Sequence, residues 1–182
     1  TINAAAGLID IDAENNVTLG ALVTTGEVQI TSTSGAIVDA AATDVEVNIT
    51  AATAALRATT GIGDDASDLE TAIGTLAAVT ESGDIVLTNG GGLIVGTVNT
   101  LSGVTITDAA MNDSGDDNIL LIANSPLTVN QAVMNNDGGD ITLTASGATA
   151  ADDLTLNATV TATGGNGAIT LNAGDSIIHN AV

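Results

Sequence analysis

The sequence predicts an all-β chain that folds over residues 1–182 as one continuous parallel β-helix, or β-solenoid. Two observations carry this prediction. Short runs that alternate aliphatic and polar residues recur at a regular spacing, and the chain contains no Phe, Trp or Tyr. The spacing is about 27 residues, within the range of roughly 20 to 50 residues that is the signature of solenoids and related repeat architectures.

The repeated unit begins with Gly, Asp or Asn, and aliphatic residues then alternate with Thr or another residue. Clear examples are Gly83-Asp-Ile-Val-Leu-Thr-Asn89, Gly139-Asp-Ile-Thr-Leu-Thr-Ala145 and Gly167-Ala-Ile-Thr-Leu-Asn-Ala173. Such alternation is typical of a strand with one buried face, and Thr favours strands through its branched β-carbon. The predicted inward-facing pairs are Ile85/Leu87, Ile141/Leu143, Leu154/Leu156 and Ile169/Leu171.

The spacing between equivalent repeats predicts the size of one coil. Leu127 and Leu154 occupy equivalent positions of matching segments, and so do Ile141 and Ile169. A coil of two or three short strands with turns fits the distance in sequence between the members of each pair. An antiparallel sandwich is the alternative, but it needs tight hairpins, and the two-residue Asn-Gly and Asp-Gly turns that mark them are scarce.

The composition indicates a narrow core. Hydrophobic residues make up 45% of the chain and the mean hydropathy is +0.41, so the chain is not a disordered acidic tail. Aromatic side chains supply much of the buried area of a thick globular interior. A solenoid interior is thin and is filled by stacked small aliphatic side chains, which this chain has in abundance.

The charge excludes two classes of partner. The formal net charge is −21, from 22 acidic residues and a single basic one, Arg57. Nucleic acid and anionic lipid are bound through clusters of Lys and Arg. We therefore expect no nucleic-acid binding. We also expect no membrane insertion, since no apolar run approaches the ~20 residues that span a bilayer.

One region departs from the β pattern and predicts a helical or loop excursion over residues 64–80. Leu69, Ile73 and Leu76 lie at helical spacing, which places a short helix near residues 67–78. Ser67 is a candidate N-cap, and Glu70, three positions later, completes a capping box.

Several of these segments resemble the repeats of filamentous-haemagglutinin-like proteins, which are giant repetitive bacterial surface proteins. The segments are Gly83-Asp-Ile-Val-Leu-Thr-Asn89, Ser125-Pro-Leu-Thr-Val-Asn130, Asp152-Asp-Leu-Thr-Leu-Asn157 and residues 164–175. Residues 56–63 and 69–78 are also similar to a segment that recurs in such chains. The resemblance implies a right-handed parallel β-helix, export to the bacterial cell surface, and a role in adhesion or matrix building.

The residues do not predict catalysis. The chain has no Lys, Tyr or Cys to act as base or nucleophile, and its one Arg and one His, Arg57 and His179, lie far apart in sequence. We expect His179 to point outward from a strand and Arg57 to pair with a carboxylate or cap a carbonyl. Pairs of acids can hydrolyse glycosides, so a carbohydrate-active β-helix enzyme stays an alternative.

Calcium is the one cofactor for which the sequence offers candidates. Asp10, Asp12 and Glu14 occupy every second position of one segment, and Asp137 and Asp140 lie in a Gly-rich turn. Carboxylate oxygens with such spacing suit Ca²⁺.

Two observations weaken that prediction. Alternation along a strand would point the carboxylates of Asp10 and Asp12 outward without any metal. Gly164-Gly-Asn-Gly167 resembles the opening of the calcium-binding β-roll repeat, but Ala168 and Ile169 lie where its Asp should fall.

From the residues and the resemblance we expect a structural segment of an exported bacterial fibre, stalk or adhesin. The chain has no signal-peptide-like start, and both termini continue the strand pattern, so we expect a piece of a longer polypeptide. Its expected partners are further copies, stacked end to end or joined in one giant chain, and cell-surface or matrix ligands. The alternative is a discrete ligand-binding adhesin module at residues 62–80, with calcium as its candidate cofactor.

Overall fold

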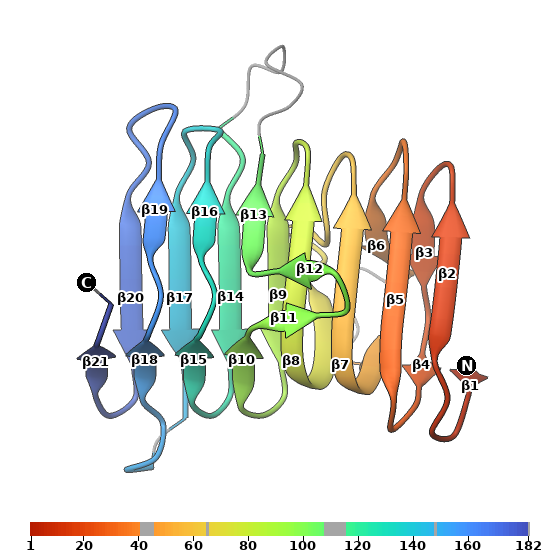
Figure 1. Cartoon of the computed structure of the whole chain (residues 1–182), viewed down its shortest axis with the longest axis horizontal. Coiled ribbons are helices and arrows are strands. Elements are labelled where there is room, and N and C mark those ends of the chain that lie inside the picture. The colour runs from red at the N-terminus through yellow and green to blue at the C-terminus, as the bar shows by residue number, and fades with distance from the viewer. Residues whose placement is uncertain (41–45, 65, 108–115, 148, 182) are drawn as a thin grey trace.

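The computed structural model describes residues 1–40, 46–64, 66–107, 116–147 and 149–181, and all of its helix or strand elements are β-strands. The predicted all-β parallel β-helix is confirmed. Successive coils lie side by side along the longest axis, with the two termini at opposite ends (Figure 1). Among the strands of these ranges, every pairing is parallel except that between β11 and β12.

The coils build three faces of stacked strands. Face A contains β2 (Ile9–Ala13), β5 (Glu27–Ser32), the second halves of β7 (Ile49–Ala58) and β8 (Leu69–Thr80), β13 (Val104–Ile106), β16 (Val133–Asn135) and β19 (Val160–Ala162). Face B contains β3 (Val17–Leu19), β6 (Ile37–Asp39), β9 (Ile85–Asn89), β14 (Ile119–Ala123), β17 (Ile141–Ala145) and β20 (Ile169–Ala173), with Ile62 bridging β6 to β9.

Face C completes the coil. In the first coils it contains β1 (Ile2–Asn3) and β4 (Leu22–Val23), which stack on the first halves of β7 and β8. In the later coils it contains β10 (Leu93–Val95), β15 (Leu127–Val129), β18 (Leu154–Leu156) and β21 (Ile177–His179), and β10 pairs with Thr75 and Leu76 at the start of the second half of β8.

The pairing register confirms the predicted repeat near the C-terminus. Leu127 pairs with Leu154 and Ile141 pairs with Ile169, the two pairs that the sequence places at equivalent positions. Elsewhere the period varies, because the turns differ in length while the strands stay in register. The coil from Ile9 to its partner Val28 is shorter, and the coil from Ile85 to its partner Ile119 is longer.

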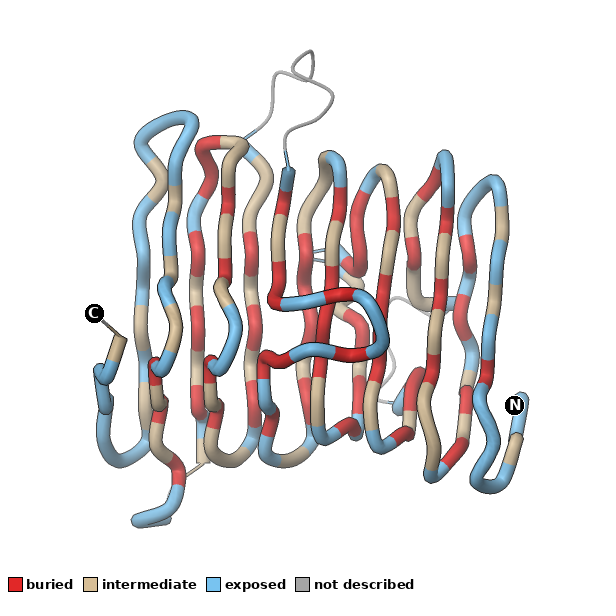
Figure 2. Tube along the Cα trace, in the orientation of Figure 1, coloured by how far each residue is buried: buried red, intermediate tan, exposed pale blue. Residues whose placement is uncertain are grey.

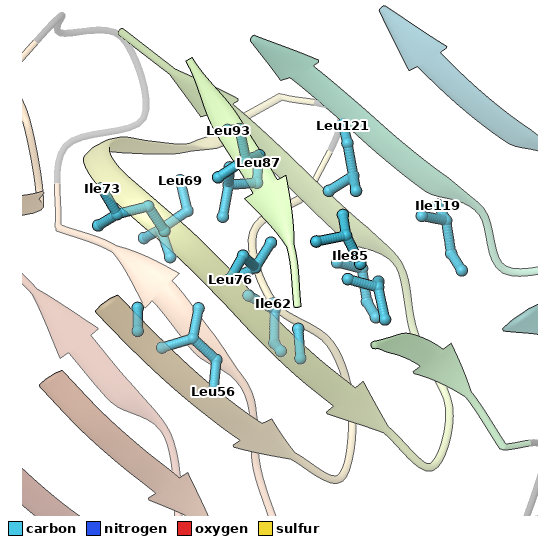
Figure 3. Close-up of a cluster of buried hydrophobic side chains, with 14 of the residues drawn as sticks. Leu56, Ile62, Leu69, Ile73, Leu76, Ile85, Leu87, Leu93, Ile119 and Leu121 are labelled. Atoms are coloured by element: carbon cyan, nitrogen blue, oxygen red, sulfur yellow. The ribbon is translucent and has the colours of Figure 1, made fainter. Parts of the chain in front are cut away.

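The core is one continuous column of aliphatic side chains that runs from Ile9 to Leu156. Figure 3 shows part of it, where side chains of adjacent coils such as Ile85 and Ile119 stack. The predicted inward pairs of β9, β17 and β18 are buried. In β20, Ile169 is 44% exposed, because that coil is covered on one side only (Figure 2).

The predicted helix over residues 67–78 is wrong, as is the wider excursion over 64–80, because β8 is a strand of the solenoid. Its buried positions alternate through Ile73 and then resume at Leu76. Gly74 lies between the start of β8, where residues 69–71 pair with β9, and its second part, where Thr75 and Leu76 pair with β10, and the alternation shifts phase there. That shift places Ile73 and Leu76 at a spacing that imitates a helical period.

The proposed capping box does not form either. The backbones of Asp64 and Ser67 bond to each other in both directions, each at 3.0 Å, and form a small bridge before β8. The backbone N–H of Glu70 donates to Asn48 Oδ1 on the neighbouring coil at 3.0 Å.

A buried amide fixes the corner between faces B and C. The Oδ1 atom of Asn89 accepts hydrogen bonds from the Ile73 N–H and the Thr71 hydroxyl, both at 2.9 Å. Its Nδ2 donates to the carbonyls of Ile73, Gly91 and Gly92. Asn89 is fully buried, and these bonds satisfy the buried backbone N–H and carbonyl of Ile73 as well as the carbonyls of the adjoining turn.

Candidate interaction surfaces

The first group of calcium candidates lies on an exposed strand. Asp10 and Asp12 project outward from β2, as alternation predicts, and the exposed Glu14 follows that strand. Asp10 pairs with Gln29 and Asp12 with Thr31, so the neighbouring coil presents no carboxylate at these positions. The two aspartates therefore lie on the surface of face A, and no acidic residue of the next coil pairs with them.

The second group of calcium candidates, Asp137 and Asp140, accepts hydrogen bonds from the backbone of neighbouring turns. Asp137 Oδ2 accepts the backbone N–H of Asp117 at 2.8 Å, and Asp140 Oδ1 accepts the N–H of Ala168 at 2.7 Å. Gly138, between them, has a φ of +97°, which favours glycine.

Asp140 belongs to a ladder of side chains that joins four coils. Asp84 Oδ1 accepts the N–H of Asn118 at 2.6 Å, and Asn118 Oδ1 accepts the N–H of Asp140 at 2.9 Å. Asp140 in turn bonds to Ala168, which has no side-chain acceptor to extend the series. These Asp and Asn residues act as turn caps that hold the coils in register.

No group of three His, Cys, Asp or Glu side chains suited to a metal occurs among the residues that the structure describes. Calcium binding by Asp10, Asp12, Glu14, Asp137 or Asp140 therefore stays a prediction. The Gly-rich segment at 164–167 has a packing role, because a Cβ on Gly167 would lie 2.1 Å from the carbonyl oxygen of Gly139.

A second ladder runs along the corner between faces C and A. Asn157 Nδ2 donates to Asn130 Oδ1, and Asn180 Nδ2 donates to Asn157 Oδ1, both at 2.8 Å. These three amides follow β15, β18 and β21 in turn. Each coil thus repeats one polar contact at its corner, which fixes the register of its neighbour.

Asp152 is the buried acid with a specific electrostatic environment. The backbone N–H and the hydroxyl of Thr149 both donate to its Oδ2 atom, at 2.5 and 2.8 Å. These bonds favour the charged form and lower the pKa of Asp152 below its ordinary value of 3.8, although burial acts in the opposite direction. The carboxylate closes the turn before β18.

A hairpin over face A is a feature that the sequence did not predict. It comprises β11 (Thr97–Val98) and β12 (Leu101–Ser102) and lies across β7 and β8 (Figure 1). Val98 and Leu101 form a second hydrophobic cluster with the small outward residues Ala55 and Ala77, which leave room for the hairpin.

A signal for this hairpin was present in the sequence. Gly96 and Gly103 close its base, with the Gly103 N–H donating to the Gly96 carbonyl at 2.8 Å. Asn99 forms its tip with a φ of +52°, a conformation that Asn adopts more readily than most residues. The glycines at the base and the Asn at the turn were the available signals, because Gly and Asn punctuate turns, although the Asn99-Thr100 tip lacks the Gly of the common two-residue hairpin turns.

Arg57 contacts the tip of the hairpin, and among the described residues no carboxylate or carbonyl is found as the partner expected for it. Its Nη2 donates to the Thr100 hydroxyl at 3.3 Å. Arg57 also lines a shallow groove at the carboxyl ends of the face A strands, together with Glu81. The rest of the groove is mostly hydroxyl-bearing: Thr31, Ser32, Thr33, Thr59, Thr80 and Thr107.

The expectation that His179 points outward is wrong. His179 pairs with Leu156, an inward-facing core residue, and lines a groove with Leu156, Ile169 and Ile177. It is exposed because no coil lies over that end of the described chain. The alternating run Ile177-Ile178-His179 fits either phase, so the pattern alone did not settle its direction.

Charged side chains are distributed unevenly over the strands. Strands β2 to β8 carry five acids and one base: Asp10, Asp12, Glu27, Asp39, Glu70 and Arg57. Strands β9 to β21, over the described residues, contain no Asp, Glu, Lys or Arg. In this second region the acids lie in the turns, as Asp84, Asp140 and Asp152 do.

Comparisons with known proteins found no relative. No family model matches the chain, and neither the curated proteins nor the solved structures contain a significant match. The resemblance to filamentous-haemagglutinin-like proteins therefore stays a prediction from the sequence. Over the described residues, the structure contains no helix long and apolar enough to cross a membrane.

Proposed function

We propose that this chain is a structural β-solenoid segment of an exported bacterial surface fibre, stalk or adhesin, in which further coils stack on its ends. Those coils belong to further copies, whether joined in one chain or associated as separate subunits. The role is mechanical and not catalytic. It requires neither a cofactor nor contact with nucleic acid or membrane.

The exposed apolar ends carry this proposal. Ile177 stacks on Leu154 and Ile169 on Ile141, both core residues, yet Ile177 is 48% and Ile169 is 44% exposed. At the other end, Ile2 pairs with the buried Leu22 and is 54% exposed. At both ends, side chains that point toward the core are left exposed. A further coil would bury them and pair the open strand edges, so these ends favour stacking.

The best test measures particle length in electron micrographs of the concentrated protein. We expect rods longer than one copy, and we expect Ile177→Asp to shorten them, because a charge would replace a side chain that the next coil covers. Ile178→Asp is the matched control, since Ile178 lies next in the same strand but faces outward and is 39% exposed. Single-copy particles in the wild type, or equal effects of both substitutions, would contradict end-to-end stacking.

One observation supports the alternative of a ligand-binding adhesin. The groove beside Arg57 combines the only basic side chain of the sequence with a row of hydroxyl groups. Within residues 62–80, the location that the sequence favours for such a module, the strand β8 (Leu69–Thr80) lies within the solenoid and does not project from it. If the groove binds a cell-surface or matrix ligand, Arg57→Gln lowers adhesion to intact cells while circular dichroism stays unchanged.

A further inference from the structure

The outward side of face B near the C-terminus is an uncharged surface on a strongly acidic chain. Its outward residues form two columns across β14, β17 and β20, and we call them the neutral face: Leu120, Thr142 and Thr170 in one column, and Ile122, Thr144 and Asn172 in the other. Leu120 and Ile122 are only half-buried, whereas the inward residues of β14 are fully buried.

We infer that the neutral face is a lateral contact site for a second copy of this chain, packed face to face. Two chains of charge −21 repel each other, so close approach is least unfavourable where neither presents a charge. The acids of this region that the structure describes lie in the turns at the strand ends, outside the two columns. A flat sheet surface of aliphatic and Thr side chains is also complementary to itself, as a two-fold contact requires.

The chemistry of the face favours a protein partner over a carbohydrate. Sugar rings are commonly bound by stacking on aromatic side chains, and this chain has none. Leu120 and Ile122 instead offer aliphatic surface, which another aliphatic surface covers well. A nucleic acid or an anionic lipid would meet the repulsion of the acidic turns.

The size of the neutral face predicts a weak contact in a single copy. Three strands at about 4.8 Å spacing and five residues in length cover roughly 240 Å², against about 800 Å² per partner in a standard stable interface. The contact gains strength when copies stack, because several neutral faces then align, and in that respect it rests on the proposed fibre. Between two unstacked copies, the contact is too weak to isolate as a stable dimer and has to be trapped by covalent cross-linking.

The absence of Cys from the sequence makes capture simple. Thr142→Cys places one thiol at the centre of the neutral face. Thr18→Cys places one at the exposed, outward position of β3, on the same face B in the charged region. With a short bis-thiol cross-linker, we expect Thr142→Cys to give covalent dimer at least several-fold faster than Thr18→Cys. The yield should rise with salt, because screening weakens repulsion between the acidic turns.

Two further variants separate this contact from end-to-end stacking. Ile122→Asp in the Thr142→Cys background should reduce the dimer yield about tenfold, since it places an unpaired charge within the contact; if it unfolds the chain, Ile122→Thr should give a smaller reduction. At protein concentrations too low for rods to form, Ile177→Asp should leave the yield unchanged, because Ile177 lies outside the two columns. Equal rates at positions 142 and 18, a yield that falls with salt, or no effect at Ile122 would overturn the inference.

Discussion

The two regions of this solenoid tolerate a large negative charge in different ways. From β1 to β8, five acids lie on the strands themselves, as Asp10 and Asp12 do, in addition to acids in the turns, and β7 and β8 run through a corner without interruption. From β9 to β21, within the described ranges, the strands are uncharged and the acids lie in turns, where Asp84 and Asp140 cap the next coil. Asp10 and Asp12 are thus exposed on a strand of the first region, whereas Asp84 and Asp140 in the second region bind backbone N–H groups of the next coil.

This difference also determines which surfaces are free for contact. In the first region, the hairpin covers part of face A and is held by Arg57 and by a bond from Asn99 to Gln29 at 3.0 Å. In the second region, face B stays flat and uncharged. We therefore expect lateral contacts on the second region and none on the charged strands of the first.

The largest expected effect comes from the stacked core of the second region. Leu121→Ala deletes a fully buried side chain and should lower the free energy of unfolding by about 2–5 kcal/mol. Leu120→Ala is the matched control on the same strand and should cost less than about 1 kcal/mol, because Leu120 faces outward. Urea denaturation measures both. Equal losses would show that the strand does not have one inward and one outward side.

A slightly smaller effect is expected at the junction of the two regions. Asn89→Ala leaves the N–H of Ile73 and three carbonyls without their side-chain partner, which should cost about 2–3 kcal/mol. Asn172→Ala, on an exposed position of β20, should change stability by less than about 0.5 kcal/mol. Thermal unfolding compares them, and a neutral Asn89→Ala would contradict the role of that corner amide.

Acidification should reveal the contribution of Asp152, an acid in a turn of the second region. The pKa of Asp152 is lowered in the folded state, so its stabilisation is complete above the unfolded value of about 3.9 and is lost as pH falls through the folded value. We expect Asp152→Asn to remove this part of the stability loss below about pH 4. Unfolding curves between pH 2 and 7 test this, and identical profiles for Asp152→Asn and wild type would contradict it.

The smallest effect concerns the exposed strand acids. The double substitution Asp10→Thr and Asp12→Thr removes two negative charges from β2 and should raise the free energy of unfolding by less than about 1 kcal/mol at low salt. The gain should vanish as salt screens the remaining repulsion. Thr142→Asp with Thr144→Asp is the converse change on β17 and should destabilise. A salt-independent gain would point to local strand preference rather than charge.

Much of this fold could be predicted from the alternation of residues, because a buried column imposes the same alternating period on every coil. The pairs Ile85/Leu87 and Ile141/Leu143 were recognisable for that reason. The strand β8 was not, because its bend at Gly74 shifts the phase of burial. Local periodicity does not distinguish a bent strand from a short helix.

The surfaces were harder to predict because they depend on which coils become neighbours. From the sequence alone, Leu120 and Ile122 could point either into the core or toward solvent. Their pairing with Thr142 and Thr144 places them on the outward surface of face B. His179 was misplaced for a related reason, since its direction is fixed by Leu156 on the preceding coil. In both cases the missing information is long-range register.

That register is the central claim, and thiol cross-linking within one chain tests it most directly. The pair Thr142→Cys and Thr170→Cys occupies facing positions on adjacent coils, whereas Thr128→Cys and Thr170→Cys lie on different faces. With a linker of about 5 Å, used at high dilution, the stacked coils predict rapid intramolecular cross-linking of the first pair and little of the second. Failure of the first pair, or equal rates for both, would contradict the parallel in-register solenoid.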